Sequence, residues 1–385
     1  MIHMPIYKMS GSKDGRQKYR VRINYIDNLG NNRQIDRVAY GNAEAKDLER
    51  RLQYELKEQT PTARMTVETL YNEYTKSITN ELRESSLEKN NKTLKTYVLD
   101  FMGDVSLKKL TPPVMQNWKN RIDEYEFKTA KGTNKLSLRT KQNIFSCFRA
   151  LLNYGIKMDY ISQNPLKKVG NFKSSGEHKK EMNYYTADEY KQFADTALSI
   201  AQKSGSLIDW NYYVFFSIAF YTGLRKGEIF ALKWSDITDN YLSVSRSITQ
   251  KLKGEDRETP PKNKSSIRTL QMPKPLIDIL NEHKIRYSIQ PQFSDDFRIC
   301  GGIKPIRDSS VSRANERIAK AAGIKRIRIH DYRHSHVSLL ANEGINIQEI
   351  ARRLGHANIE MTWNTYSHLY PREEERAVEI LNKIV

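Results

Sequence analysis

Three stretches in the second half of the chain decide its fold: Thr222-Gly-Leu-Arg-Lys-Gly-Glu228, His330-Asp-Tyr-Arg-His334 and Leu354-Gly-His356, with Tyr366 further on. They place two arginines, two histidines and one tyrosine in a fixed order: Arg225, His330, Arg333, His356 and Tyr366. A phosphoryl transition state spreads negative charge over its non-bridging oxygens, so guanidinium and imidazole donors around a tyrosine nucleophile can stabilise it without a cation. This order of residues therefore predicts a metal-free site that cuts phosphodiester bonds.

A helix N-terminus is the predicted position of Arg225. An apolar core helix is expected over Tyr212–Tyr221 and a short helix over Leu224–Asp236, with Arg225 near the start of the second helix. Backbone N–H groups and the helix dipole at that place favour an anion. The alternative role for Arg225 is a buried ion pair with Glu228 or Asp236.

His330 and Arg333 are three residues apart, so on a helix they project from one face and can flank one phosphate. An isolated pair of this kind would more simply be a core histidine beside a surface arginine. His356 follows Gly355, which lets the backbone turn closely, and Tyr366 is one of 22 tyrosines. Only the position of these residues relative to one another points to a shared site.

A lysine on a hairpin is the candidate proton donor. The stretch Tyr241–Ser247, a polar loop and the stretch Thr259–Pro273 together resemble a β-hairpin, whose tip would place Lys262 or Lys264 toward the minor groove of DNA. An ammonium group beside a developing alkoxide can deliver a proton to the leaving oxygen. Without the other motifs, either lysine would be a solvated surface residue.

The composition favours a nucleic-acid partner. The 385 residues include 64 Lys or Arg against 45 Asp or Glu, which gives a formal net charge of +19. Basic side chains that neutralise phosphates release counterions, and this release drives binding to polyanions. An anionic membrane surface or a need for solubility would produce the same charge balance. A chain of this length is expected to form two or three domains.

Cysteine usage and hydropathy argue against several classes of protein. Cys147 and Cys300 have no paired spacing, which disfavours a disulfide framework and a thiolate zinc site and favours a reducing cytoplasm. The start of the chain lacks a signal-peptide pattern, and the longest apolar stretch, Tyr212–Tyr221, is too short to span a bilayer. The sequence therefore predicts a soluble, cytoplasmic protein, and no motif in it points to a cofactor or a metal.

The first 62 residues are predicted to form a small DNA-binding domain. Period-two alternation over Ile6–Met9, Tyr19–Tyr25 and Arg33–Tyr40 predicts a three-stranded antiparallel sheet, and a polar helix follows over about Ala43–Glu58. This segment has an excess of basic residues. Because sheets can enter DNA grooves with alternate side chains, DNA contact is the favoured interpretation, and a solvated sheet face is the alternative.

Residues 63–165 are predicted to form a helical bundle. Thr66 opens a capped helix, and further helices are expected over Ser86–Phe101, Thr111–Tyr125 and Leu138–Met158. Several basic residues on these helices could line a DNA-facing surface, although a solvated charged face explains each of them equally well. These residues are Lys89, Lys92, Lys95, Arg139, Lys141 and Arg149.

A change in composition separates the bundle from the last domain. Residues 166–184 are rich in Lys, Gly and Ser, and they predict an extended linker whose lysines could follow a phosphate backbone. Thr186-Ala-Asp-Glu189 is a capping box that opens the largest domain, residues 185–385. The expected fold is mostly α with small β elements: a three-stranded sheet plus helix, a helical bundle and a mixed α/β domain.

The motifs of the last domain closely resemble those of the tyrosine recombinases, or phage-type integrases. The resemblance rests on the three stretches quoted first together with Pro261-Lys262 and Tyr366-Ser-His368, and it covers most of the last domain. It implies that the upstream parts are the arm-binding and core-binding domains of an integrase from a phage or a conjugative transposon. Trp363, where many relatives carry an aliphatic residue, is expected to pack in the core, or else to help seat the tyrosine helix.

The resemblance also implies a mechanism. Tyr366 attacks a DNA phosphate and leaves a 3′-phosphotyrosine and a free 5′-hydroxyl, which then attacks a partner strand, so neither ATP nor metal is required. Arg225 and Arg333 clamp the non-bridging oxygens of the phosphate, and His356 supports the phosphate by hydrogen bonding.

Proton transfer and assembly are implied in the same way. Lys262 would be the general acid for the 5′ oxygen, with Lys264 as the alternative, and His330 would be the base or a phosphate ligand. The family works as a tetramer on two DNA duplexes and often passes a C-terminal segment to a neighbouring subunit. Residues 372–385 could be that segment or could pack on their own subunit. An excision factor or a DNA-bending host protein could be a further partner.

Three functions compete at this point. The favoured one is a site-specific recombinase that integrates and excises a mobile genetic element, because the basic N-terminal sheet adds a second DNA-binding module. A type IB topoisomerase-like enzyme would share the site without exchanging strands, and an architectural DNA-binding protein would carry the site in vestigial form. A metal-dependent nuclease is disfavoured, since no acidic pair accompanies the histidines.

Overall fold

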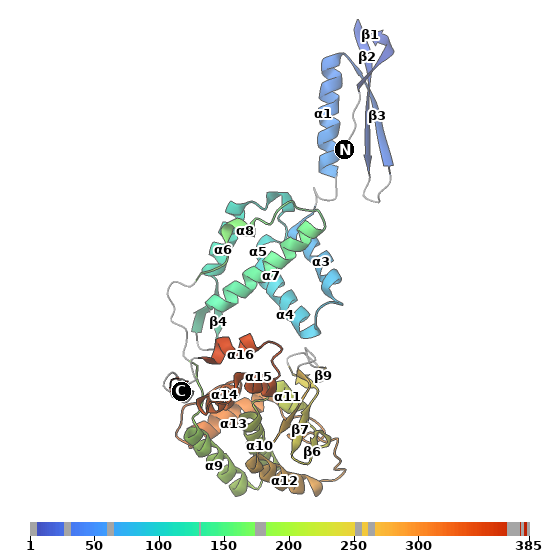
Figure 1. Cartoon of the computed structure of the whole chain (residues 1–385). Coiled ribbons are helices and arrows are strands. Elements are labelled where there is room, and N and C mark those ends of the chain that lie inside the picture. Colours follow the sequence, from blue (N-terminus) through green and yellow to red (C-terminus); the bar gives the residue numbers. More distant parts are fainter. Residues whose placement is uncertain are drawn as a thin grey trace. The chain divides into compact units, whose positions relative to one another are not determined.

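The computed structural model describes residues 6–26, 32–59, 65–130, 132–173, 182–250, 256–260, 266–367, 378 and 381–382. The chain divides into two compact units, Met1–His178 and Lys179–Val385. The first unit holds a small sheet with its helix and a helical bundle, and the second holds the motifs that predict the chemistry (Figure 1). Within the described ranges, no helix is both long and apolar enough to cross a bilayer.

The N-terminal sheet has the three antiparallel strands that the alternation predicts. The strands are β1 (Ile6–Lys13), β2 (Arg16–Ile26) and β3 (Asn32–Tyr40), paired in the order β1-β2-β3. Helix α1 (Asn42–Gln59) lies along the sheet (Figure 1) and packs on Val21 and Ile23 of β2 through Ala45 and Leu52. Because side chains alternate along a strand, this packing leaves the intervening residues of β2 on the opposite face.

The helical bundle begins at Thr66, as predicted. The Thr66 side chain caps α3 (Val67–Ile78) and exchanges hydrogen bonds with Thr69. The helices that follow are α4 (Glu84–Leu94) with a π turn at Lys95–Leu99 and α5 (Asp100–Met102), a 3-10 turn at Leu107–Lys109, α6 (Pro112–Asp123), α7 (Leu138–Lys157) and α8 (Leu166–Val169). Trp118 and Phe148 pack edge to face in the core, with 4.8 Å between their ring centroids.

Two parts of the bundle differ from the expectation. A short hairpin, β4 (Glu126–Thr129) and β5 (Gly132–Lys135), stands where only helices were predicted; its side chains are exposed, so no apolar alternation marks it. The start of the predicted linker is wrong, because Leu166 and Phe172 are buried in the bundle core. Burying these two apolar side chains stabilises a folded end of the bundle over an extended chain. Residues 174–181 of the predicted linker lie outside the described residues.

The second unit surrounds an apolar helix, as predicted. The Thr186 side chain caps α9 (Ala187–Ser204) with the reciprocal bond from Glu189, and α10 (Leu207–Thr222) is buried along most of its length. The remaining helices are α11 (Lys226–Ala231), a 3-10 turn at Trp234–Asp236, α12 (Lys274–Ser288), α13 (Asp308–Ala321), α14 (Asp331–Asn342), α15 (Ile347–Leu354) and α16 (Ile359–Tyr366). The single helix predicted over Leu224–Asp236 is thus two short pieces.

Short strands form the β part of this unit, on one side of its helices (Figure 1). They are β6 (Ile237–Thr238), β7 (Tyr241–Val244), β8 (Ser247–Thr249), β9 (Arg257–Thr259) and β10 (Arg268–Gln271). One sheet has the order β10-β7-β6 and the other pairs β8 with β9, all antiparallel. The two pairs are nested in the sequence, β8 with β9 inside β7 with β10, so Lys262 falls between β9 and β10 along the chain and not between the innermost paired strands.

Two buried histidines make the stability of the second unit depend on pH. His283 and His336 are almost fully buried, and burial lowers their pKa values to about 4 and about 3. The Nδ1 atom of His336 lies 2.8 Å from the carbonyl oxygen of Phe220, to which the neutral ring donates. Both rings are therefore neutral in the folded chain at neutral pH.

We expect the free energy of unfolding to decrease as the pH falls from 6.5, the ordinary histidine value, to about 4. In this window the unfolded chain binds a proton on each ring and the folded chain does not, so acid favours unfolding, by about 1.4 kcal/mol per pKa unit and group. Urea unfolding at a series of pH values measures the slope. His336→Asn keeps a donor for Phe220 but cannot titrate, so its profile should be flatter; identical slopes would contradict this prediction.

Candidate active site

Helix α14 brings His330 and Arg333 to the site. His330 is the residue that precedes the helix and is exposed, whereas Arg333 is buried, with 3% of its surface accessible. The first turn is held by Asp331, whose carboxylate accepts hydrogen bonds from the backbone N–H of Arg328 at 2.8 Å and from its guanidinium at 2.7 Å. The helix therefore presents an imidazole at its rim and a guanidinium in the interior.

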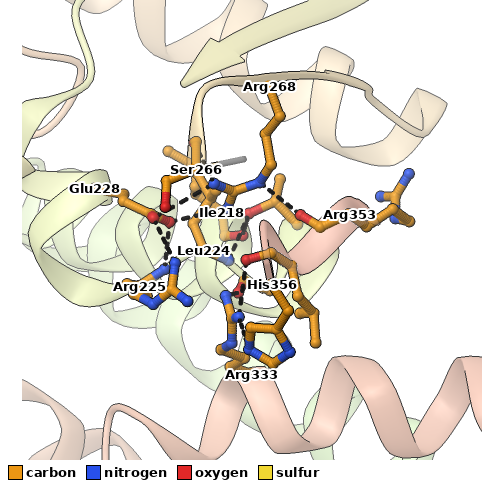
Figure 2. Close-up of polar contacts among 12 residues, drawn as sticks. Ile218, Leu224, Arg225, Glu228, Ser266, Arg268, Arg333, Arg353 and His356 are labelled. Carbon is orange, nitrogen blue, oxygen red and sulfur yellow. Dashed lines mark hydrogen bonds and ion pairs between the residues drawn. The ribbon is translucent and has the colours of Figure 1, made fainter. Parts of the chain in front are cut away.

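Arg333 connects the segments that carry Arg225 and His356. Its Nη1 donates to the carbonyl oxygen of Gly223 at 2.8 Å, and its Nη2 donates to the carbonyl oxygen of Leu354 at 2.8 Å and to Nε2 of His356 at 2.7 Å (Figure 2). Burial, and then the charge of Arg225, lower the pKa of Arg333 to about 9, so it remains positively charged at neutral pH. Three of the predicted site residues thus meet around one guanidinium.

Arg225 is held by Glu228. Its Nη1 donates to Oε1 of Glu228 at 3.0 Å and its backbone N–H to Oε2 at 2.9 Å, so the ion pair considered as an alternative is present (Figure 2). The side chain of Arg225 nevertheless keeps 39% of its surface exposed, which leaves it open to an anion. The other alternative, a pair with Asp236, is wrong, because Asp236 pairs with Arg246 at 2.6 Å.

Arg268 of β10 supports this arrangement and was missed from the sequence. Its Nη2 donates to Glu228 at 2.9 Å and its Nε to the carbonyl oxygen of Arg353 at 2.7 Å (Figure 2). Burial raises the pKa of Glu228, but the charge and hydrogen bond of Arg268 outweigh burial and hold that pKa below its ordinary value. The alternation of the strand could have pointed to it, because Arg268 is two residues before Leu270 and so lies on the same buried side of the strand.

Gly355 allows the close turn that the sequence predicted before His356. It ends α15 with a φ of +64°, and a Cβ atom there would lie 2.8 Å from Nη1 of Arg268. A side chain at this position would therefore collide with the buried arginine as well as strain the backbone. The absence of a side chain lets His356 come close to Arg333.

Tyr366 is the last residue of α16, and only 2% of its surface is exposed. Its hydroxyl lies 2.5 Å from Nδ1 of His334, one helical turn beyond His330, and the two imidazole rings are 5.1 Å apart. Burial raises the pKa of Tyr366 to about 12, against the charge of Arg333, which lowers it. His334 belongs to a motif quoted from the sequence, but no role was predicted for it. Its spacing of four residues from His330 could have indicated that both rings lie on one face of the helix.

Trp363 does not pack in the core as expected, since 52% of its surface is exposed. Thr362 and Tyr366 are four residues apart and take the buried face of α16, which leaves residue 363 outside that face.

Lys262 and Lys264 lie outside the described residues, as do residues 372–385 apart from 378, 381 and 382. No group of three or more His, Cys, Asp or Glu side chains within the described ranges could hold a metal ion.

The basic residues of the bundle are mostly on its surface. Lys141 is the exception, because it pairs with Asp123 at 2.6 Å and is partly buried. The other five residues named for a DNA-facing surface are exposed: Lys89, Lys92, Lys95, Arg139 and Arg149.

Two family profiles match the chain in agreement with this geometry. The phage integrase family profile matches residues 183–373, which include every described residue of the site, and the phage integrase N-terminal SAM-like domain matches residues 66–122 in the bundle. The chain belongs to the phage integrase family.

Integrases and related recombinases resemble it over long spans. The ICEBs1 integrase of Bacillus subtilis is 26% identical over 98% of this chain and 100% of its own length. A XerC-like tyrosine recombinase of Caldanaerobacter subterraneus is 29% identical over 66% of this chain and 68% of its own. This integrase is accordingly a tyrosine-type site-specific DNA recombinase of a mobile genetic element, as the motifs implied.

Solved structures confirm the predicted fold class. The Tn1549 transposon integrase in complex with a circular intermediate DNA superposes with a TM-score of 0.64 at 20% identity, covering 83% of this chain and all of that one. A lambda integrase dimer bound to a COC′ core site gives 0.54 at 20% identity, covering 96% of this chain and 95% of that one. At these identities the likeness concerns the fold.

Proposed function

We propose that this integrase cuts and rejoins DNA through Tyr366 and holds the scissile phosphate with Arg225, Arg333 and His356. The observation that carries this proposal is the position of Arg333, whose guanidinium bonds both the turn before Arg225 and the ring of His356. Preorganised donors of this kind stabilise the charge that develops on non-bridging oxygens.

The chemical step exchanges one ester for another. The phenolic oxygen of Tyr366 forms a bond to phosphorus while the bond from phosphorus to the 5′ oxygen breaks, which gives a 3′-phosphotyrosine and a 5′-hydroxyl. The phenol loses a proton and the leaving oxygen gains one. Although part of its surface is exposed, His330 is desolvated by the surrounding protein, and this and then the charge of Arg333 lower its pKa; both favour the neutral ring, which can accept a proton or bind the phosphate. Lys262, or Lys264, would supply the proton to the leaving oxygen.

Covalent trapping tests this function. Element-end DNA with a nick close to the cleavage point loses the short 5′-hydroxyl fragment after cleavage, so the adduct cannot be resealed. A denaturing gel should show a protein–DNA adduct, and peptide mapping should place it on Tyr366. An adduct on another residue, or none on any element end, would refute the proposal.

The described part of residues 1–62 would bind arm-type DNA sites, and the bundle that follows would bind core sites. The support comes from the outward face of β2, where Arg20 and Arg22 form ion pairs with Asp36 of β3 at 2.6 and 3.2 Å and leave their side chains partly exposed. Guanidinium groups on the open face of a sheet suit contacts with phosphates or base edges.

Deleting residues 1–62 should spare cleavage of a minimal core site and impair recombination on DNA that also carries distal arm sequences. Two linked binding modules gain avidity, so affinity for the longer DNA should fall by about 100-fold or more. Gel-shift titration and recombination assays on both DNAs measure this. The variant Arg20→Ala/Arg22→Ala keeps the domain and should reproduce part of the loss; equal recombination by the deleted chain on both substrates would reject the arm-binding role.

Strand exchange requires more than one active site, so we infer that several copies act together on two duplexes. A lambda integrase tetramer bound to a Holliday junction has the same fold, with a TM-score of 0.52 at 20% identity over 92% of this chain and 95% of that one. A tetramer on a four-way DNA junction is the assembly that this likeness supports. Residues 372–385 would link neighbouring copies, and an excision factor or a DNA-bending host protein would set the direction.

A further inference from the structure

Helix α16, which carries the nucleophile, is fastened at two points. Thr362 and Tyr366 lie four residues apart on one face of the helix, and both are buried. Each is paired with a histidine from another segment: Oγ1 of Thr362 lies 2.8 Å from Nδ1 of His356, and the hydroxyl of Tyr366 lies 2.5 Å from Nδ1 of His334. Two hydrogen bonds one turn apart therefore fix the helix both along its axis and in rotation.

The direction of the first bond follows from the chemistry of arginine. A guanidinium has no acceptor, so Nη2 of Arg333 must donate to Nε2 of His356, and that nitrogen carries no proton. Burial and the charge of Arg333 lower the pKa of His356 to about 4, so the ring is neutral and its proton is on Nδ1. Nδ1 therefore donates to Thr362. One imidazole ring links the phosphate-binding arginine to the tyrosine helix.

The second bond runs the other way. A buried phenol needs an acceptor for its proton, and Nδ1 of His334 is within hydrogen-bond distance of the Tyr366 hydroxyl. Burial lowers the pKa of His334 to about 4, and burial raises that of Tyr366 to about 12, so the proton stays on the phenol and Nδ1 accepts. The proton of the neutral His334 ring is then on Nε2.

We propose that His334 holds the nucleophilic oxygen of Tyr366 in place for attack, while Thr362 is a positioning residue that acts through His356. His334 stands on α14 one turn after His330 and next to Arg333, so the same helix that binds the phosphate also orients the hydroxyl that attacks it. This inference rests on the proposed function and adds two residues to it. A nucleophile misplaced by a small distance loses much of its rate, because the attacking oxygen must be in line with the leaving oxygen.

The two amide replacements of His334 give a geometric test. In His334→Asn the side-chain oxygen can occupy the place of Nδ1, whereas in His334→Gln it reaches the place of Nε2, one atom further from the backbone. The single-turnover rate of adduct formation on nicked core-site DNA should stay within about threefold of the wild type for Asn, and fall by about 10- to 100-fold for Gln and for His334→Leu. DNA affinity should not change in any of them.

Thr362 has an isosteric variant. Thr362→Val removes the hydroxyl and keeps the shape, so the rate should fall by about fivefold, the effect of one hydrogen bond. Asn364→Ala, on the exposed face of the same helix, is the matched control and should behave as the wild type.

The outcomes that overturn the inference differ from those that refute the function. Equal rates for His334→Asn and His334→Gln would mean that bulk and not the hydrogen bond matters, and a rate for either His334→Leu or Thr362→Val at or above the wild type would exclude a positioning role. A wild type that forms no adduct would refute the proposed function instead.

A measurement on the free protein tests the His334–Tyr366 hydrogen bond without DNA. It applies even if the wild type forms no adduct or a His334 variant fails to fold. Ring ¹⁵N spectra of the whole protein should show His334 protonated on Nε2, with the Nδ1 signal shifted in Tyr366→Phe. An unchanged Nδ1 signal would overturn the inference.

Discussion

Tyr366→Phe should abolish covalent attachment of the protein to DNA and leave DNA binding nearly unchanged. The substitution removes a single oxygen, and the ring keeps its place among Val337, Ala341, Ile350 and Leu354. Phenylalanine has no oxygen that could form the phosphotyrosine bond, so adduct on nicked DNA should drop to background on a denaturing gel. The change removes no positive charge from the protein, so binding to the DNA phosphates should not weaken.

The control must show that the Tyr366→Phe variant is folded and still binds DNA. Loss of the hydroxyl leaves Nδ1 of His334 without a donor, which should cost about 1 kcal/mol, too little to unfold the domain. Gel-shift titration on intact core DNA should give the wild-type affinity. If Tyr366→Phe still formed a covalent complex, the nucleophile would have to be another residue.

Arg268→Met should lower both the stability of the catalytic unit and the rate of cleavage. The guanidinium of Arg268 is almost completely buried between Glu228 and the carbonyl oxygen of Arg353. Its removal leaves the buried carboxylate of Glu228 paired only with the half-exposed Arg225, and breaking a buried pair of this kind costs about 3–5 kcal/mol. The turn before His356 also loses its support, so the phosphate-binding donors should converge less well.

A double variant separates charge from packing. In Arg268→Met/Glu228→Gln the buried charge is gone as well, so much of the lost stability should return, while cleavage should stay slow because Arg225 has lost its anchor. Urea unfolding gives the stabilities, and single-turnover adduct formation gives the rates. Additive losses in the double variant would mean that Arg268 acts through packing alone.

The residues that we propose for catalysis could be grouped from the sequence because their order along the chain is itself informative. Arg225, Arg333, His356 and Tyr366 lie inside short motifs, and in the folded chain Arg333 bonds the turn before Arg225 and the ring of His356. The residues that hold them could not be found in this way. Arg268 contacts Arg353, 85 residues later, and the hydrogen bond between His334 and Tyr366 spans 32 residues, so these pairs exist only in the folded chain.

Contacts between residues far apart in the sequence also explain why parts of the fold were predicted wrongly. The composition of residues 166–184 favours an extended chain on average, but Leu166 and Phe172 find partners in a core whose other members lie far away in the sequence. Trp363 was predicted to be buried because tryptophan is a large apolar residue. Its exposure instead follows from the burial of Thr362 and Tyr366, which lie on another face of α16. Periodicity within a segment was reliable, as the three N-terminal strands demonstrate.

The main-chain anchors of Arg333 have a stereochemical consequence. Of the five N–H groups of its guanidinium, three point to Gly223, Leu354 and His356, which fixes the plane of the group; the other two have no partner among the described residues. An immobile plane presents a handed surface to the incoming phosphate, so the two prochiral oxygens of the scissile group are not equivalent to this enzyme. A sulfur atom placed on one of them or on the other would meet unequal surroundings, and the two diastereomeric phosphorothioates should react at different rates.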